Sequence, residues 1–454
     1  MKMFSAKKSV IAAVVFFGAL VGIYLGLSFA FPQAKEPKPT FLRVEGFWDN
    51  SVFNVLKKEF QKRHPEVTVE YEKKSPDHYL PNLTADLANP TKTPDVFWWH
   101  SGWGPVLNNS LAALPSKVMD TTTYEKTFYP ITKTDLKIAG SYRGFPLEFD
   151  GLALLYNKRT FASRNFLEAP KTWTTLAQDY VPSLTLNDRN SRVLTSAIAL
   201  GSVSNVENFS EIIGLFLLQN GVEFTKNGQI AFYDSKQREV TKLTSDAIDF
   251  YLAFSKKYHT WDNTQPDSIE AFARGQTAMI ILPLYKIHDL LSFLRSSNLT
   301  LDFAVAPIPQ LPNSPLVTWG SYWSVGVSAT SRQKEAAWEF AKFMVAPDSL
   351  RLVYQNETKN SDFGRAYPRV AMAKEQTTNP YLAAYLAGAQ YAKSWYLQSD
   401  TFDQVFNDKI IASFKTNLAS VENSGSSESV LKRLATEIQP VLKKYGVVTT
   451  LIGN

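Results

Sequence analysis

The fold is decided by residues 144–158, GFPLEFDGLALLYNK, in the first half of the chain. Within this stretch, Leu152 to Tyr156 form a continuous apolar run. A strand with one face in water alternates polar and apolar residues, whereas a strand covered on both faces does not. The run therefore predicts a strand in the interior of an α/β sheet.

A second pattern lies nearer the N-terminus. Phe41 to Gly46 predict a strand, and Val52, Leu56 and Phe60 then recur every four residues, as on the buried face of an amphipathic helix. Residues 67–71 alternate apolar and polar side chains with the period of a strand. Strand, helix and strand in close succession form a βαβ unit, which favours an α/β fold.

The same alternation continues along the chain. The last third, from about Tyr381 to Tyr445, has mainly helical patterns, and another helix is predicted after Ser331. The sequence thus predicts an α/β fold with a helical C-terminal region. Further strands are predicted at 95–99, 277–282, 303–306 and 322–327.

Length and composition fit a large globular protein with two lobes. The chain has 454 residues, of which 44% are hydrophobic and 20% charged. The formal net charge is +6, but Lys2, Lys7 and Lys8 contribute three of these charges and the remainder forms no basic block. We therefore expect no nucleic-acid partner.

The N-terminus has the features of a secretory leader. The three lysines precede an uncharged, largely apolar run from Ser9 to Phe31. Such an arrangement keeps the N-terminus in the cytoplasm and sends the following chain across the membrane. Residues 1–31 are predicted to be a signal peptide cleaved near Ser28-Phe29-Ala30, or an uncleaved signal anchor, and residues 32–40 a linker.

The sequence contains no cysteine, which excludes a lipid-modified cysteine behind the leader. We expect the body of the protein in the periplasm, either soluble or anchored to the inner membrane by residues 9–31.

Common enzyme motifs are missing from the sequence. It has no phosphate-binding loop, no nucleophile elbow, no zinc-protease motif and no dinucleotide fingerprint. Its five histidines never lie at ligand spacing from one another, so we predict neither a metal site nor a cofactor. A glycosidase needs only two carboxylates that the fold brings together, so that activity stays open.

Aromatic residues gather in and beside the predicted strand ends, where ligands of α/β sheets bind. Sugar rings have apolar faces that flat aromatic side chains cover, and a rim of hydroxyls that polar side chains satisfy. Core packing is the alternative role for each tryptophan. The alternation of a strand points Trp98 and Trp99 to opposite faces, so at most one of these faces is expected to meet ligand. The candidates are Trp48, Trp98, Trp99, Trp103, Trp319, Tyr322 and Trp323.

Several segments match one known family in order and spacing. The most specific is 144–158, which leads into Pro170-Lys171-Thr172-Trp173, a Pro-x-Thr-Trp helix start; FARGQTAM at 272–279 matches the signature Phe-x-x-Gly-x-Ala-Met with one extra residue. By these segments the chain resembles the extracellular solute-binding family 1, which contains the maltose- and oligosaccharide-binding proteins of ABC importers. Further matches lie at 53–69, 94–99, 111–114, 306–309 and 331–343.

The resemblance implies a two-lobed, type II-like periplasmic-binding-protein fold with hinge crossovers that closes on its ligand. One lobe would hold residues 41–148 and 312–352, and the other 152–308 and 366–454. The first crossover would fall near residues 149–151. The protein would work as a monomer that delivers a carbohydrate to an ABC permease in the inner membrane.

The resemblance also implies binding positions. Trp48 and Asp49 resemble the loop after the first strand, which meets sugar hydroxyls. Trp98 or Trp99, together with Trp103, resembles the stacking tryptophan and its neighbours.

On the other side of the implied cleft, Asp150 resembles the acidic hinge residue and Tyr285 the aromatic residue of the second lobe that stacks on the sugar. The sequence departs from the family at His100-Ser101-Gly102, where charged loop residues are usual. This departure puts that part of the sugar recognition in doubt.

Two further departures concern the region after residue 310. Trp319, Tyr322 and Trp323 are more aromatic than the usual Gly- and Ser-rich segment, and either extend the aromatic platform or pack the lobe. Arg365, in the segment 364–368, could reach the cleft near the third crossover, but a solvated loop arginine is the favoured interpretation.

We predict from these observations an extracytoplasmic solute-binding protein that captures a sugar, within that class an oligosaccharide, for an ABC transporter, without catalysis. The alternatives are a membrane-anchored ligand sensor and a binding protein for a polyamine or glycerol phosphate. A secreted glycosidase is less favoured.

Overall fold

The computed structural model describes residues 39–190, 192–399, 401–423 and 426–449. The predicted leader and nearly all of the linker lie outside these residues. No helix in the described ranges combines the length and the apolar character needed to cross a bilayer.

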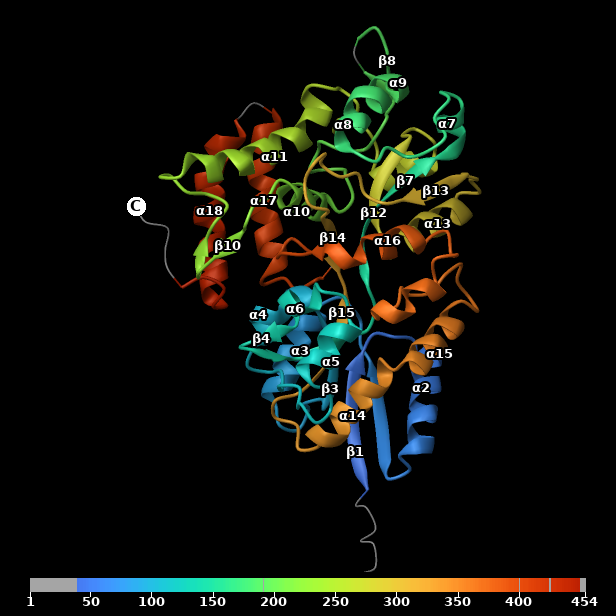
Figure 1. Ribbon diagram of the computed structural model, residues 1–454, viewed down its shortest axis with the longest axis vertical. Helices are drawn as coiled ribbons and strands as arrows, with labels where there is room; N and C mark the ends of the chain where they lie inside the picture. The colour runs from blue at the N-terminus through green and yellow to red at the C-terminus, as the bar shows by residue number, and fades with distance from the viewer. Residues whose placement is uncertain (1–38, 191, 400, 424–425, 450–454) are drawn as a thin grey trace, which may run out of the picture.

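The first sheet forms the core of the lower half of the molecule (Figure 1). Its strand order is β2-β1-β3-β15-β6; β1 runs parallel to β2 and β3, and β15 runs antiparallel to β3 and β6. The predicted βαβ unit is confirmed, because helix α2 (Asn50–Arg63) connects β1 to β2. The strands are β1 Thr40–Gly46, β2 Val67–Lys73, β3 Val96–His100, β6 Gly144–Pro146 and β15 Trp323–Val327.

The second sheet lies in the upper half and is built around β7 (Asp150–Asn157), the strand predicted from the apolar run. Seven of its eight residues are buried, as expected for a strand covered on both faces. Three antiparallel neighbours pair with it: β12 and β13, and β14 at its first two residues. These strands are β12 Met279–Pro283, β13 Phe303–Ala306 and β14 Thr318–Ser321, and β16 Ala392–Lys393 pairs with β14.

The chain crosses between the two sheets at neighbouring segments. The first crossing leads from β6 to β7 and the second from β14 to β15. They lie side by side, since Ser321 pairs with Asp150 and the Leu147 N–H donates to the Trp323 carbonyl at 2.9 Å. A third segment joins them, because the Phe149 N–H donates to the Ala366 carbonyl at 3.0 Å. Hinge crossovers of this kind let two halves of a protein open and close.

Helices cover both sheets. Helices α2 and α14 (Lys334–Met344) pack against the first sheet, and α15 (Pro347–Glu357) packs on α2. The upper half holds α13 (Lys286–Ser296) and a helical group at one side that includes both C-terminal helices, as predicted (Figure 1). This group consists of α10 (Phe209–Gln219), α11 (Arg238–Lys256), α17 (Asn407–Asn423) and α18 (Ser427–Lys444).

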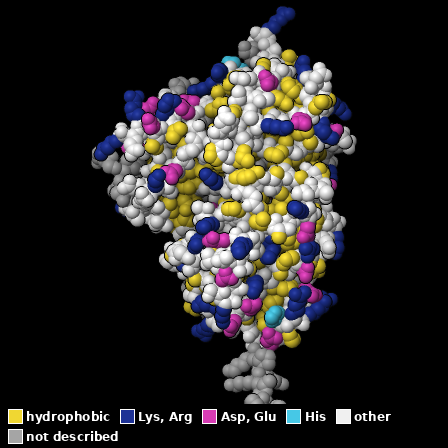
Figure 2. Space-filling model, in the orientation of Figure 1, with side chains coloured by type: hydrophobic (Ala, Val, Ile, Leu, Met, Phe, Trp, Pro, Cys, Tyr) yellow, Lys and Arg dark blue, Asp and Glu magenta, His cyan; other side chains and the backbone are white. Residues whose placement is uncertain are grey.

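The surface in Figure 2 carries lysine and arginine side chains interspersed with aspartate and glutamate. No field of one sign dominates this face of the molecule. Nucleic-acid-binding proteins concentrate basic side chains on the face that meets the phosphates.

Candidate functional site

A cavity of about 660 Å³ lies where the crossing segments meet. Its volume falls within the usual range of small-molecule sites. Both halves of the molecule contribute to its wall, which mixes aromatic and polar side chains. From the first half and the crossings come Phe47, Trp48, Asp49, His100, Glu148, Asp150, Tyr322, Trp323, Glu357 and Arg365, and from the second half Leu284, Tyr285, Lys286, His288, Asp289, Ser399 and Phe402.

Aromatic side chains line the cavity from both halves. Trp323, at the start of β15, is partly exposed and makes an edge contact with the ring of Phe47, with ring centroids 4.3 Å apart. From the second half, Tyr285 precedes α13, and its hydroxyl accepts a hydrogen bond from Asn208 Nδ2 at 3.2 Å. The cavity therefore has apolar ring surface available on two sides.

A buried charge cluster forms the wall next to Trp48. The Arg365 guanidinium binds the Glu357 carboxylate through Nε and lies 3.5 Å from the Glu148 carboxylate through Nη1. Its carbon centre sits 4.3 Å from the Trp48 ring centroid, a cation–π contact. Burial raises the pKa of Glu148, and the neighbouring Arg365 acts in the opposite direction.

Asp150 connects the first crossing to helix α13. Its carboxylate accepts hydrogen bonds from the backbone N–H groups of Gly151 at 2.6 Å, Leu284 at 2.7 Å and Tyr285 at 3.1 Å. Two of these donors belong to the N-terminal end of α13, where a negative charge is favourable. Burial raises the pKa of Asp150 to about 8, while the N–H donors favour the charged form. The side chain holds Tyr285 in place at the cavity wall.

His100 contributes a neutral imidazole. Its Nδ1 accepts from the Gly102 N–H at 3.3 Å, so Nε2 carries the proton and donates to Ser321 Oγ at 3.1 Å. Burial lowers the pKa of His100 to about 3. The ring can therefore position the second crossing but carries no charge at neutral pH.

The structure brings six of the sequence-predicted binding residues to the cavity wall. Asp49 is exposed and pairs with Lys73, whereas Trp48 is almost fully covered by Arg365 and its other neighbours. Tyr322 is also mostly buried. The six are Trp48, Asp49, Asp150, Tyr285, Tyr322 and Trp323.

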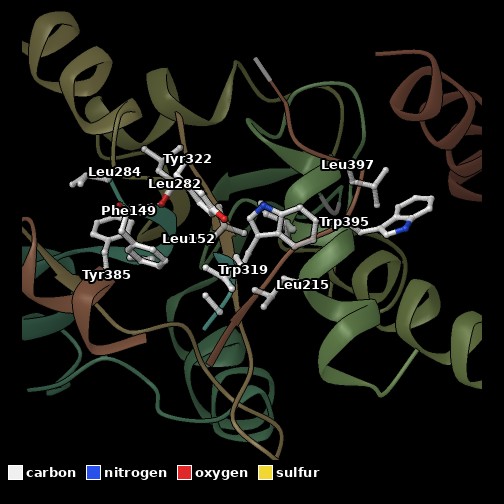
Figure 3. Packing of buried hydrophobic residues seen from close by; sticks show 14 of the residues in the cluster. Phe149, Leu152, Leu215, Leu282, Leu284, Trp319, Tyr322, Tyr385, Trp395 and Leu397 are labelled. Carbon is white, nitrogen blue, oxygen red and sulfur yellow. Dashed lines mark hydrogen bonds between the residues drawn. The ribbon is translucent and has the colours of Figure 1, made fainter. Parts of the chain in front are cut away.

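The other four, Trp98, Trp99, Trp103 and Trp319, are fully buried and do not line the cavity. Trp319 lies between β7 and α10, with its ring close to Leu152 and Leu215 (Figure 3). This packing depends on Gly214, where an added Cβ would come within 2.4 Å of the indole.

Trp98 and Trp99 project to opposite faces of the central strand β3, as predicted, but both faces are covered. The Trp98 ring packs on the backbone of Gly46, and Trp99 packs on Gly144 and Gly326. Because both indoles fill core space, the expectation that one of them stacks on a ligand is not met in this structure.

Sequence reasoning missed the charge cluster. Arg365 was expected to be solvated, and this interpretation is wrong, because the side chain is only 24% exposed and paired with two carboxylates. Glu148 belongs to the quoted stretch 144–158, yet nothing in the local sequence indicates its partner. Glu357 lies eight residues before Arg365, a spacing that no regular element explains.

Among the described residues no group of three or more histidine, cysteine, aspartate or glutamate side chains is arranged to hold a metal ion. The carboxylates of the cavity wall are instead bound to cationic side chains and backbone N–H groups. The arrangement is chemically that of a binding cavity.

A family model identifies the protein class. Residues 49–350, about two thirds of the chain, match the model of the bacterial extracellular solute-binding proteins. The chain belongs to this family. Solute-binding proteins work outside the cytoplasm and bind rather than convert their solute, so this protein is not an enzyme.

A curated relative of this solute-binding protein shares less than a quarter of its aligned residues. A protein of Brucella abortus named as a binding protein is 23% identical over 307 residues, which cover 67% of this chain and 71% of the relative. Two solved structures share the two-lobed fold. A cyclo/maltodextrin-binding protein in complex with maltotetraose has a TM-score of 0.68 at 16% identity, covering 90% of this chain and 98% of the other. A cyclic α-maltosyl-1,6-maltose-binding protein from Arthrobacter globiformis has a TM-score of 0.67 at 18% identity, covering 89% and 100%.

Proposed function

We propose that the protein captures a saccharide, within that class an oligosaccharide, in the cavity between its lobes and delivers it to the permease of an ABC importer. The observation that carries the proposal is the cavity wall, which has aromatic rings from both halves and hydrogen-bonding side chains between them. The solved structures of similar fold, which are named for maltotetraose and cyclic maltosyl-maltose, support the same class of ligand.

The chemistry of the wall suits a sugar ring. Trp323 and Tyr285 can cover the apolar faces of pyranose units, because neither ring is fully buried. Between them, Glu148, Asp150 and Arg365 offer acceptors and donors for hydroxyl groups. Trp48 supports the wall through Arg365 rather than by direct stacking.

We propose the bounds of the two lobes from the sheet to which each strand belongs. The first lobe would hold residues 41–148 and the second 152–308 and 366–454. The segment 312–352 is better divided at Tyr322, because β14 pairs with β7 and β15 with β3. A monomer in the periplasm, soluble or held by residues 9–31, remains our expectation for the whole protein.

The proposal is tested by thermal unfolding of the full-length chain with maltotetraose, mannotriose, spermidine or glycerol 3-phosphate. A ligand at 100 times its Kd stabilises the folded state by about 2.7 kcal/mol. Stabilisation by one of the sugars supports the proposal. Stabilisation by spermidine or glycerol phosphate alone would keep the binding protein and replace its ligand. No response to any of the four would contradict saccharide capture.

A further inference from the structure

The cavity wall contains three features that could bind an anionic ligand, and protein carboxylates already occupy each of them. The features are Arg365, Lys286 and the N-terminal end of α13. Guanidinium groups, ammonium groups and helix N-termini are what proteins use to hold the phosphates and carboxylates of ligands. Whether an anionic sugar can bind therefore depends on whether these three features are free or already bound to protein carboxylates.

Arg365 is held by two carboxylates and one ring. Glu357 binds both its side chain and its backbone N–H, the latter at 3.1 Å, and Glu148 lies 3.5 Å from Nη1. Trp48 covers the guanidinium plane at 4.3 Å. A phosphate would have to displace one of the carboxylates to form the paired hydrogen bonds that arginine makes with anions.

The other two features are occupied in the same way. Asp150 accepts the backbone N–H groups of Leu284 and Tyr285 at the start of α13. The ammonium group of Lys286 lies 3.0 Å from a carboxylate oxygen of Glu207 and 3.3 Å from one of Asp289. No cationic group of the described cavity wall is left without a carboxylate partner.

The wall as a whole has an excess of acidic groups. In the described part of the chain, two cationic side chains line the cavity against four carboxyl groups besides Asp150, those of Asp49, Glu148, Asp289 and Glu357. An anionic group of a ligand placed against such a wall is repelled by the carboxylates and also loses its hydration. An uncharged sugar meets neither penalty, and its hydroxyls can both donate to the carboxylates and accept from the arginine.

We propose that the cavity selects uncharged saccharides and rejects their anionic counterparts, the sugar phosphates and uronates, because its anion-binding groups are already satisfied from within. This selection rests on the proposed function, since it concerns the same cavity. It assigns to Glu148 and Glu357 a role in specificity that is distinct from holding the fold.

The test compares matched neutral and anionic sugars by titration calorimetry on the full-length chain. The probes are maltotetraose and mannotriose, each beside its 6-phosphate. Wild type is expected to bind at least one neutral sugar at least about tenfold more tightly than its phosphate. Glu357→Gln and Glu148→Gln, which each remove one negative charge, are expected to narrow this ratio about tenfold. Glu375→Gln removes a charge from an exposed arginine pair away from the cavity and should leave the ratio unchanged.

The outcomes separate the two proposals. If a phosphorylated sugar binds wild type as tightly as its neutral counterpart, the selection is overturned while saccharide capture stands. An unchanged ratio in folded Glu357→Gln and Glu148→Gln also overturns it, because the two carboxylates then do not set the preference. If none of the four sugars binds, the proposed function fails and the selection fails with it. The comparison of neutral with phosphorylated sugars on wild type tests the selection even if both variants are unstable.

Discussion

Closure of the two halves should depend on a contact that lies away from the crossings. The segment after β16 in the second half reaches Ser101 and Gly102, which follow β3 in the first half. Ser101 Oγ donates to Gln398 Oε1 at 3.0 Å, and Asn407 Nδ2 donates to the Gly102 carbonyl at 3.2 Å. A Cβ at residue 102 would lie 2.9 Å from Gln398 Oε1 and 3.0 Å from Asn407 Nδ2. Gly102→Ala should therefore displace the ends of these two side chains and break the hydrogen bonds that join the halves here.

The size of the effect follows from these contacts. Each hydrogen bond contributes about 1 kcal/mol net, so loss of both destabilises the arrangement of the halves seen in this structure by about 2 kcal/mol. If ligand binds only this arrangement of the halves, the affinity for ligand falls by up to about thirtyfold. Thermal stability should change less, because each half keeps its own core.

Titration calorimetry with maltotetraose measures the affinity, and small-angle scattering of the unliganded protein measures the separation of the halves. The matched control is Gly104→Ala, whose Cβ would lie nearest to Ile138 and Asp135 of the first half, at 3.3 Å or more. If Gly102→Ala keeps the affinity and the radius of gyration of wild type, the contacts at residue 102 do not hold the halves together.

Other expectations concern the cavity and the buried acids. Trp323→Ala should lower saccharide affinity by about tenfold to a hundredfold in calorimetry, whereas Tyr391→Ala, a partly exposed tyrosine that does not line the cavity, should not. Burial raises the pKa of Glu45 and Asp135 to about 7 and that of Asp150 to about 8. The folded state then binds more protons than the unfolded state, so the free energy of unfolding should fall as pH rises from about 4 to 8. Asp150→Asn should flatten this slope in denaturant titrations, and a stability that increases with pH over this range would contradict the assignment.

Much of the fold could be predicted because its signals are local. The apolar run 152–156 marks β7, and the four-residue spacing of Val52, Leu56 and Phe60 marks α2, as the structure has them. Both patterns reflect which faces of an element are covered, and a single stretch of chain records that.

The cavity could be predicted only in part, because its wall depends on contacts between distant residues. A tryptophan beside a strand end can pack in the core or meet a ligand. Residues distant in the sequence determine which of the two occurs. Trp319 packs in the core because Gly214, more than a hundred residues away, leaves space for its indole. Arg365 is likewise drawn out of solvent by a distant partner, because its side chain pairs with Glu148 on the first crossing. No periodicity connects such partners.

The most direct test of the central claim is a crystal structure of the protein with the saccharide that stabilises it most. We expect electron density for the sugar in the cavity at the crossings, in contact with Trp323 from one half and Tyr285 from the other. A sugar bound at another surface, with this cavity holding only water, would contradict the account.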